Sequence, residues 1–387
     1  MDKLFELSSL DNNVDMQEVL TGNNTAVIKV IGIGGGGCNA VDNMIKNNIS
    51  NVDFICANTD SKALSRNKAP TLLQLGHNLT RGLGAGSKPD IGKKAAMEDR
   101  EKISALLKGA NMLFIAAGMG GGTGTGAAPV VAEIAKSLNI LTVGVVTKPF
   151  RYEGEKRRLA AEAGIAELKK HVDSLIVLPN EKLISELSPD VSLLEAFSAS
   201  DNILQGAVLG ITEIIYTPGI ISVDFADVQT VMQGRGLAMM GTAIATGPDR
   251  AREAAEQAIH SPLLDDVTID GAAGVLVNIS AAPGSLKISD YNTIAEIFHN
   301  HVSSDADFKM GTSDSAELVN DELRVTIIAT GLSDVDTTLR DGSTLFQKNT
   351  AEVTNDIQDN SLNDQFNDVG INKNIFSTPS FFRKNRS

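Results

Sequence analysis

The feature that most constrains this chain is a glycine-rich loop at residues 118–126, which reads Gly-Met-Gly-Gly-Gly-Thr-Gly-Thr-Gly. An apolar run at 112–117 precedes it and is typical of a buried strand, while 127–136 has the composition of a helix. Glycines let several backbone N–H groups approach an anion closely, because no side chain is in the way. The partial positive charge at the start of the following helix adds to this attraction. Six glycines in nine residues exceed what a turn needs, so the loop predicts a phosphate site.

A second glycine loop, at 32–37, also follows a predicted strand and precedes a predicted helix. Gly32, Gly34 and Gly37 fit the dinucleotide pattern G-x-G-x-x-G, and Asp53 follows at roughly the spacing of a ribose contact. The sequence contains no G-x-x-x-x-G-K-[ST], which excludes a Walker-type NTPase. Without a loop lysine, we expect backbone amides and a metal ion to meet the phosphate charge.

The order of predicted elements indicates an α/β fold with a doubly wound parallel sheet. Short β-branched runs alternate with helical stretches from Ala26 to about Asn180. Apolar residues at three- and four-residue spacings then predict one long central helix from near Val191 to Tyr216, followed by a smaller α/β domain. The predicted strands are 26–33, 53–59, 72–75, 112–117, 141–147, 174–178, 238–246, 273–281 and 322–330. The other predicted helices include 90–108, 155–170, 248–260 and 289–301. The predicted domains are 26–190, 191–223 (the long helix and the loop after it) and 224–332.

Composition excludes several classes of protein. A formal charge of −14 argues against a nucleic-acid binder, since polyanions would be repelled. Cys38 and Cys56 are the only cysteines and lack metal-type partners, which favours a reducing cytosol. Residues 1–25 lack the apolar core of a signal peptide and are expected to form a flexible extension. No apolar run approaches 18 residues, so we expect no insertion into a membrane.

The C-terminal part changes character after residue 332. Residues 333–374 are acidic and polar with scattered apolar positions, which predicts a disordered linker. Residues 375–387 regain aromatic and basic side chains, and an apolar-basic segment on such a linker favours a docking peptide.

Three motifs in this order give the chain a family likeness. The loop at 118–126 resembles the tubulin signature, the segment 223–228 reads Val-Asp-Phe-Ala-Asp-Val, and the tail carries Pro379 and Phe381 in a Pro-x-Phe motif. The chain therefore resembles the tubulin/FtsZ family of GTPases from about Ala26 to Leu332 and again at the C-terminus. The resemblance implies that the first domain binds GTP, held as GDP after hydrolysis, together with Mg²⁺, and it leaves K⁺ open as a further cofactor.

The resemblance also implies which residues hold the nucleotide, with no metal ligand among them. Glu153 and Arg157 match ribose and nucleotide contacts; a solvated helix face is the alternative for this charge run. Phe197 and Asp201 match residues that stack on guanine and accept from its N1–H and 2-amino edge, although Phe197 also suits a core. The residues of the two loops that the resemblance implies as phosphate contacts are Gly35, Gly36, Gly37, Cys38, Asn39, Gly122, Thr123 and Gly124.

Asp224 and Asp227 are the catalytic residues that the resemblance implies. A helix of about 25 residues spans nearly 40 Å, so if Phe197 and Asp201 touch the base at one end, these carboxylates lie at the other. They could then act only on the nucleotide of a neighbouring subunit stacked head to tail, and such a contact propagates into a filament. An Asp-x-x-Asp pair after a helix is otherwise typical of a cap or a solvated turn. Ser222 stands where the family usually carries Asn.

The partners that the resemblance implies are other copies of the chain and division proteins. It predicts protofilaments that form a cytokinetic ring in the cytoplasm, at mid-cell and on the inner face of the membrane. Pro379, Phe381 and Arg383 match a motif that binds membrane-tethering and regulatory division proteins such as FtsA.

Two other functions remain open from the sequence. A dinucleotide-dependent enzyme would use the 32–37 pattern, but it needs a proton-transfer residue and leaves the 118–126 loop unexplained. A nucleotide-binding scaffold with little turnover is compatible with Ser222, while the two aspartates argue against it.

Overall fold

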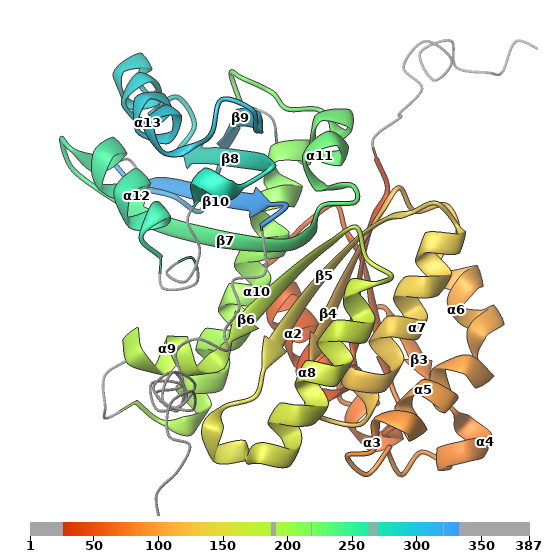
Figure 1. Ribbon diagram of the computed structural model, residues 1–387. Helices are drawn as coiled ribbons and strands as arrows, with labels where there is room; N and C mark the ends of the chain where they lie inside the picture. The colour runs from red at the N-terminus through yellow and green to blue at the C-terminus, as the bar shows by residue number, and fades with distance from the viewer. Residues whose placement is uncertain are drawn as a thin grey trace, which may run out of the picture. The chain divides into compact units, whose positions relative to one another are not determined.

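The β-branched runs of the first half form six strands that are all parallel, in the order β3-β2-β1-β4-β5-β6 (Figure 1). The computed structural model describes residues 26–186, 191–217, 219–261, 264, 269–319 and 321–332. The predicted extension at 1–25, the linker at 333–374 and the docking peptide at 375–387 lie outside these residues. The strands of this half are β1 (Ile28–Ile33), β2 (Asp53–Asn58), β3 (Thr71–Gln74), β4 (Met112–Gly118), β5 (Leu141–Lys148) and β6 (Ser174–Pro179).

Helices cover both faces of this sheet, as a doubly wound fold requires. Successive residues of a strand point to opposite faces, and Val30 and Ile31 accordingly belong to two different core clusters. Val30 lies in a cluster with residues of α2 and of the long helix α10 (Leu193–Tyr216), and Ile31 lies in one with residues of α5, α6, α7 and α8. The helices of this half are α2 (Gly34–Lys46), α3 (Ser61–Leu64), α4 (His77–Thr80), α5 (Pro89–Glu98), α6 (Arg100–Leu107), α7 (Thr123–Ser137), α8 (Glu155–Lys169) and α9 (Asn180–Glu186).

The second half continues the same sheet in the order β7-β10-β8-β9. Strand β6 joins β7 through only three residue pairs, from Ser174↔Gly236 to Ile176↔Ala238. One face carries α12 and α13, and the other shares the core of the long helix α10. The predicted α/β fold class is thus confirmed. Its elements are α11 (Phe225–Met232), β7 (Gly236–Ala245), α12 (Arg250–Ile259), β8 (Gly274–Ala281), α13 (Ile288–His301), β9 (Asp307–Asp314) and β10 (Leu323–Thr330).

Helix α10 (Leu193–Tyr216) holds 24 residues and is therefore about 36 Å long. Ser192 and Glu195 form a capping box at its start, in which the Glu195 N–H donates to Ser192 Oγ at 3.2 Å. At its end, the Tyr216 hydroxyl donates to the Ala26 carbonyl and accepts from the Ile28 N–H at 3.2 Å. The helix thus ends beside the first residues of β1, at the edge of the sheet opposite the glycine loops.

The structure corrects the prediction of one helix over 90–108, because α5 ends at Glu98 and α6 begins at Arg100. Between them, Asp99 has non-helical dihedral angles (φ −103°, ψ 22°) and a buried carboxylate. The Gly76 N–H donates to that carboxylate at 2.7 Å, and Lys102 forms an ion pair with it at 2.6 Å. A tertiary hydrogen bond therefore breaks a pattern that looks continuous in the sequence.

Strand β9 was missed, because Asp-Phe-Lys-Met-Gly-Thr-Ser-Asp lacks the alternation of a half-buried strand. The first glycine helix also begins earlier than predicted, at Gly34 and not at Cys38.

Gly126 tests the packing of α7 against α5. A Cβ at this position would lie 1.9 Å from the Pro89 carbonyl oxygen, so α5 would have to move. We expect Gly126→Ala to lower the free energy of unfolding by about 1–3 kcal/mol, as overpacking does. Gly271→Ala is the matched control, because its Cβ would meet nothing within 4 Å. Urea unfolding of both variants measures the difference, and equal midpoints would contradict the close approach.

Candidate functional site

The two glycine loops come together where β1 and β4 end. Strands β1 and β4 are neighbours in register, with Ile33 opposite Ala117, so their loops leave the same edge of the sheet. A Cβ on Gly34 would lie 2.9 Å from the Gly124 nitrogen, and φ at Gly34 is +74°, a value that favours glycine. The loops therefore contact each other backbone to backbone, with the N-termini of α2 and α7 side by side. Such a pair of helix starts favours an anion.

A cavity of about 440 Å³ opens beside these loops. It draws residues from both loops, from the ends of β5 and β6, from α8 and from the first turns of α10, and a site of this size suits a nucleotide-sized ligand. Ten of the twelve predicted nucleotide contacts line it: Gly35, Gly36, Asn39, Gly122, Thr123, Gly124, Glu153, Arg157, Phe197 and Asp201.

Gly37 and Cys38, the other two predicted contacts, do not line the cavity. A Cβ on Gly37 would lie 2.1 Å from the Ala116 carbonyl oxygen, so this glycine permits close packing on β4. The Cys38 thiol turns inward, with Sγ 3.5 Å from the Gly32 carbonyl and 3.7 Å from the Ala57 carbonyl. A hydrogen bond with Cys38 and, after it, burial raise the pKa of the nearby Cys56 thiol. The side chain of Cys38 is thus part of the core.

Glu153 and Arg157 form an ion pair at the mouth of the cavity. Glu153 ends a short 3₁₀ turn, and its Oε1 accepts from the Phe150 N–H at 3.0 Å, which fixes the carboxylate. Arg157 lies in the first turn of α8, and its guanidinium reaches back to Glu153. The neighbouring Arg158 pairs with the exposed Glu155 and Glu162. The side chains of Arg157 and Arg158 are 48% and 50% exposed, so the solvated helix face that the sequence offered as the alternative includes both arginines.

Phe197 and Asp201 lie one helical turn apart on α10 and face the same cavity. The Phe197 side chain is 41% exposed, although the ring meets Phe150 edge to face at a centroid distance of 5.2 Å. An exposed aromatic face of this kind is available for stacking on a base. Burial raises the pKa of Asp201 to about 6, and the positive charge of Lys46 opposes the shift.

Several residues that line the cavity were missed from the sequence, among them Asn180, Thr147 and Ser200. Asn180 is the first residue after β6, and its Oδ1 accepts from the Ser200 hydroxyl at 2.9 Å. Its position at the carboxyl end of a parallel strand was the available signal, because ligands of open α/β sheets bind at that edge. Thr147 carried the same signal at the end of β5.

Asp224 and Asp227 do not reach this cavity. They lie beyond the far end of α10, where α11 ends with the Met232 carbonyl accepting from Ser174 Oγ at 2.6 Å. Ser174 begins β6, whereas Asn180 at the other end of that strand lines the cavity. Within one subunit, the fold therefore separates these two carboxylates from the cavity beside the glycine loops.

Asp224 and Asp227 also form a capping box on α11. The Asp227 N–H donates to Asp224 Oδ1 at 2.8 Å, and the Asp224 N–H donates to Asp227 Oδ2 at 3.4 Å. Lys309 on β9 forms an ion pair with Asp227 at 2.7 Å and lowers the pKa of its carboxyl. The sequence offered a cap as an alternative to catalysis, and the cap is present, although Asp224 remains exposed.

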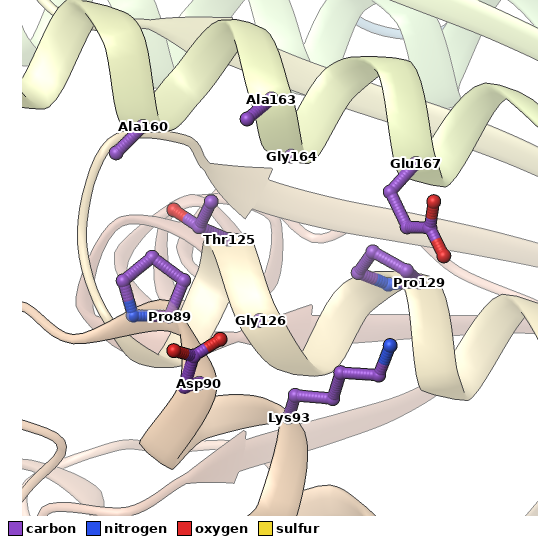
Figure 2. A pocket seen from close by; sticks show the side chains of 10 residues that line it. All are labelled: Pro89, Asp90, Lys93, Thr125, Gly126, Pro129, Ala160, Ala163, Gly164 and Glu167. Atoms are coloured by element: carbon purple, nitrogen blue, oxygen red, sulfur yellow. The ribbon is translucent and has the colours of Figure 1, made fainter.

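A second hollow, of about 360 Å³, lies between α5, α7 and α8 (Figure 2). Small residues such as Ala160, Ala163 and Gly164 form much of its wall, with Asp90, Lys93 and Glu167 as its charged groups. None of the predicted nucleotide contacts lines it. Within the described part of the chain, no group of three or more His, Cys, Asp or Glu side chains could hold a metal ion.

Comparison with protein families gives two matches. Residues 27–188 match the model "Tubulin/FtsZ family, GTPase domain", and residues 236–333 match "FtsZ family, C-terminal domain". No helix among the described residues is both long and apolar enough to cross a membrane.

The chain is also similar to individual proteins over most of its length. It is 60% identical over 310 residues to "Cell division protein FtsZ" of Neisseria gonorrhoeae, covering 80% of this chain and 79% of that protein. The protein of the same name from Pseudomonas aeruginosa is 58% identical over 308 residues, covering 80% of this chain and 78% of the other. A solved structure described as "FtsZ dimer, empty (M. jannaschii)" superposes with a TM-score of 0.77 at 41% identity, covering 83% of this chain and 93% of that one.

Proposed function

Since this chain belongs to the FtsZ family of tubulin-like cell-division GTPases, we propose that its GTP is hydrolysed between subunits stacked head to tail. The observation that carries the proposal is the separation of Asp224 and Asp227 from the cavity by the length of α10. A carboxylate at that distance cannot orient water on its own subunit's nucleotide. A solved relative described as an FtsZ dimer supports contact between copies.

In this proposal the cavity beside the glycine loops holds GTP. The loop amides and the N-termini of α2 and α7 meet the phosphates. Glu153 and Arg157 contact the ribose side, while Phe197 stacks on the base. Asp201 accepts from the N1–H and 2-amino groups, which adenine does not present in this arrangement, so it selects guanine.

Mg²⁺ fits this site as a companion of the nucleotide. The described residues supply no carboxylate cage, but Thr123 lines the cavity, and its Oγ1 lies 2.6 Å from Thr59 Oγ1, which holds the side chain in place. Mg²⁺ usually keeps several waters and binds through substrate phosphates, which suits such a donor set. When bound, it neutralises phosphate charge; K⁺ stays a prediction from the family likeness.

Asp224 and Asp227 of the next subunit would complete the site by orienting the attacking water. Phosphoryl transfer depends mainly on positioning and electrostatic stabilisation, which one subunit's carboxylates and the other's loop amides provide together. Hydrolysis would then weaken the contact that built the site. A scaffold with little turnover remains the second candidate, because the exposed Ser222 precedes the pair where the family usually carries Asn.

We further propose that the filaments work in the cytoplasm, on the inner face of the membrane at the division site. Pro379, Phe381 and Arg383 would bind tethering proteins such as FtsA. The sequence motif alone supports this step, since these residues lie outside the described part of the chain.

The dependence of GTPase activity on protein concentration tests the shared site. With Mg²⁺ present, we expect a threshold in the micromolar range and rising activity per molecule above it, because only assembled subunits carry complete sites. Phosphate release and light scattering measure both quantities in one series. A constant, nonzero activity per molecule would mean hydrolysis within one subunit. Assembly without phosphate release would favour the scaffold.

Asp224→Asn separates chemistry from capping. Asparagine caps a helix about as well as aspartate, so α11 keeps its start while the negative charge is lost. We expect assembly at an unchanged threshold and turnover reduced about 100-fold, the usual scale for loss of a positioned base. Asp249→Asn is the control, since Asp249 is exposed and its side chain does not cap α12. Normal turnover in Asp224→Asn would remove this residue from the mechanism.

The pKa of Asp201 predicts how guanine binding depends on pH. Only the ionised carboxylate accepts from both guanine donors, and a pKa of about 6 means that most molecules lose this form below pH 6. Between pH 7.5 and 5.5, we expect the affinity for GDP to fall about fourfold from this group. Asp201→Asn should bind GDP more weakly and lack this fall, while it retains any effect of phosphate titration. Calorimetry on both proteins gives the comparison, and parallel pH profiles would contradict the role of Asp201.

A further inference from the structure

We propose that Lys309 is a positioning residue of the shared hydrolytic site: it holds Asp227, so that Asp224 presents a free carboxylate oxygen to the neighbouring subunit. This inference rests on the proposed function, because it concerns hydrolysis between subunits. Lys309 itself touches neither the nucleotide nor the attacking water in this scheme. It acts through the first turn of α11.

Strand β9 fastens α11 near both of its ends. Lys309 and Asp307 are two residues apart, so their side chains lie on the same face of the strand. Near the start of α11, Lys309 Nζ lies 2.7 Å from Asp227 Oδ1. Near its end, Arg235 forms an ion pair with Asp307 and donates to the Thr230 carbonyl at 3.2 Å. The helix that carries the carboxylates is thus fixed to a strand.

The two aspartates are held differently, although the sequence presents them as an equivalent pair. Both oxygens of Asp227 are engaged, Oδ1 by Lys309 and Oδ2 by the Asp224 N–H at 3.4 Å. Asp224 uses Oδ1 for the Asp227 N–H at 2.8 Å, and within the described chain its Oδ2 takes part in no recorded hydrogen bond or ion pair. Asp224 is also the more exposed of the two. Asp224 therefore has the oxygen that is available to a neighbour.

Lys309 also offsets the repulsion between the carboxylates around it. Its pKa is raised, first by the hydrogen bond and charge of Asp227, with Asp224 and Asp307 adding to the effect. Without this cation, Asp224 and Asp227 would be two adjacent negative charges in a short turn, which favours separation of their side chains. The ammonium group of Lys309 offsets this repulsion and keeps the turn closed.

The geometry favours a role in positioning over one in stability. The side chains of Lys309 and Asp227 are 38% and 33% exposed, and partly exposed pairs contribute little to folding. The backbone of Lys309 is held in place by the sheet, because Lys309 is paired in register with the buried Leu276 of β8. Active-site groups held by regular elements are more accurately placed than groups on loops.

Lys309→Met and Lys309→Arg test the proposal in the full-length protein with GTP and Mg²⁺. Methionine keeps much of the length and removes the charge. For this variant we expect kcat per assembled subunit to fall about tenfold, because small misplacements of reacting groups are costly. The KM for GTP and the assembly threshold should stay within about twofold of the unchanged protein, since neither depends on an interaction made only in the transition state. Arginine should restore at least half of the lost kcat.

Two further variants separate positioning from general loosening of α11. Arg235→Met breaks the ion pair near the other end of the helix and is the matched control; it should leave kcat close to normal. Adding Lys309→Met to Asp227→Asn should cost nothing beyond Asp227→Asn alone, because the lysine acts through that carboxylate. Normal kcat in Lys309→Met, no recovery with arginine, an equal loss in Arg235→Met, or additive losses in the double variant would each overturn the proposal.

The activity per molecule of the unchanged protein distinguishes a failure of the proposed hydrolysis between subunits from a failure of the proposed role of Lys309. If its activity per molecule does not rise with assembly, the proposed function fails, and the inference fails with it. If that activity rises while Lys309→Met behaves normally, only the role of Lys309 is wrong.

Discussion

The contact between the two glycine loops is the interaction on which the rest of this structure depends. Gly34 and Gly124 meet with no room for a Cβ, and Gly37 is pressed against the Ala116 carbonyl in the same way. These contacts bring the N-termini of α2 and α7 to one point at the edge of the sheet. The strand order, the direction of α10 and the placement of Asn180 and Thr147 all converge on that edge. A side chain at Gly34 would meet the Gly124 nitrogen and separate the helix starts.

Much of this fold and site could be predicted from the sequence, because local patterns decide it. Strand β4 is an almost continuous apolar run, β1 is rich in β-branched residues, α10 has clear helical spacing, and glycine loops have few alternative uses. The features that were missed depend on contacts between distant segments. Asp99 breaks a helix because it meets Gly76, and β9 is a strand because β8 offers it a partner. Cys38 turns into the core because Gly32 and Ala57 lie behind it. A short window of sequence contains only one side of the contact between Gly76 and Asp99 or of the pairing between β8 and β9.

The start of α11 shows how a helix cap can decide which carboxylate oxygens are engaged. The capping box explains why two aspartates stand three residues apart, and this explanation needs no catalysis. The cap nevertheless decides which oxygens are engaged, and so leaves Asp224 with a free one. The capping role and the proposed catalytic role of Asp224 are therefore compatible. In the proposed mechanism, the cap gives this carboxylate the fixed direction that a reaction between two molecules requires.

The length of α10 has a consequence for how this chain can change. Adding or removing one residue in the helix would shift everything after it by about 1.5 Å and rotate it by about 100°. The cavity at one end of the helix and Asp224 and Asp227 beyond the other would then change their relative orientation. Tyr216 would also leave the first residues of β1, where it is anchored. Surface loops of this protein can vary in length, whereas the number of residues in the central helix is as constrained as their identity.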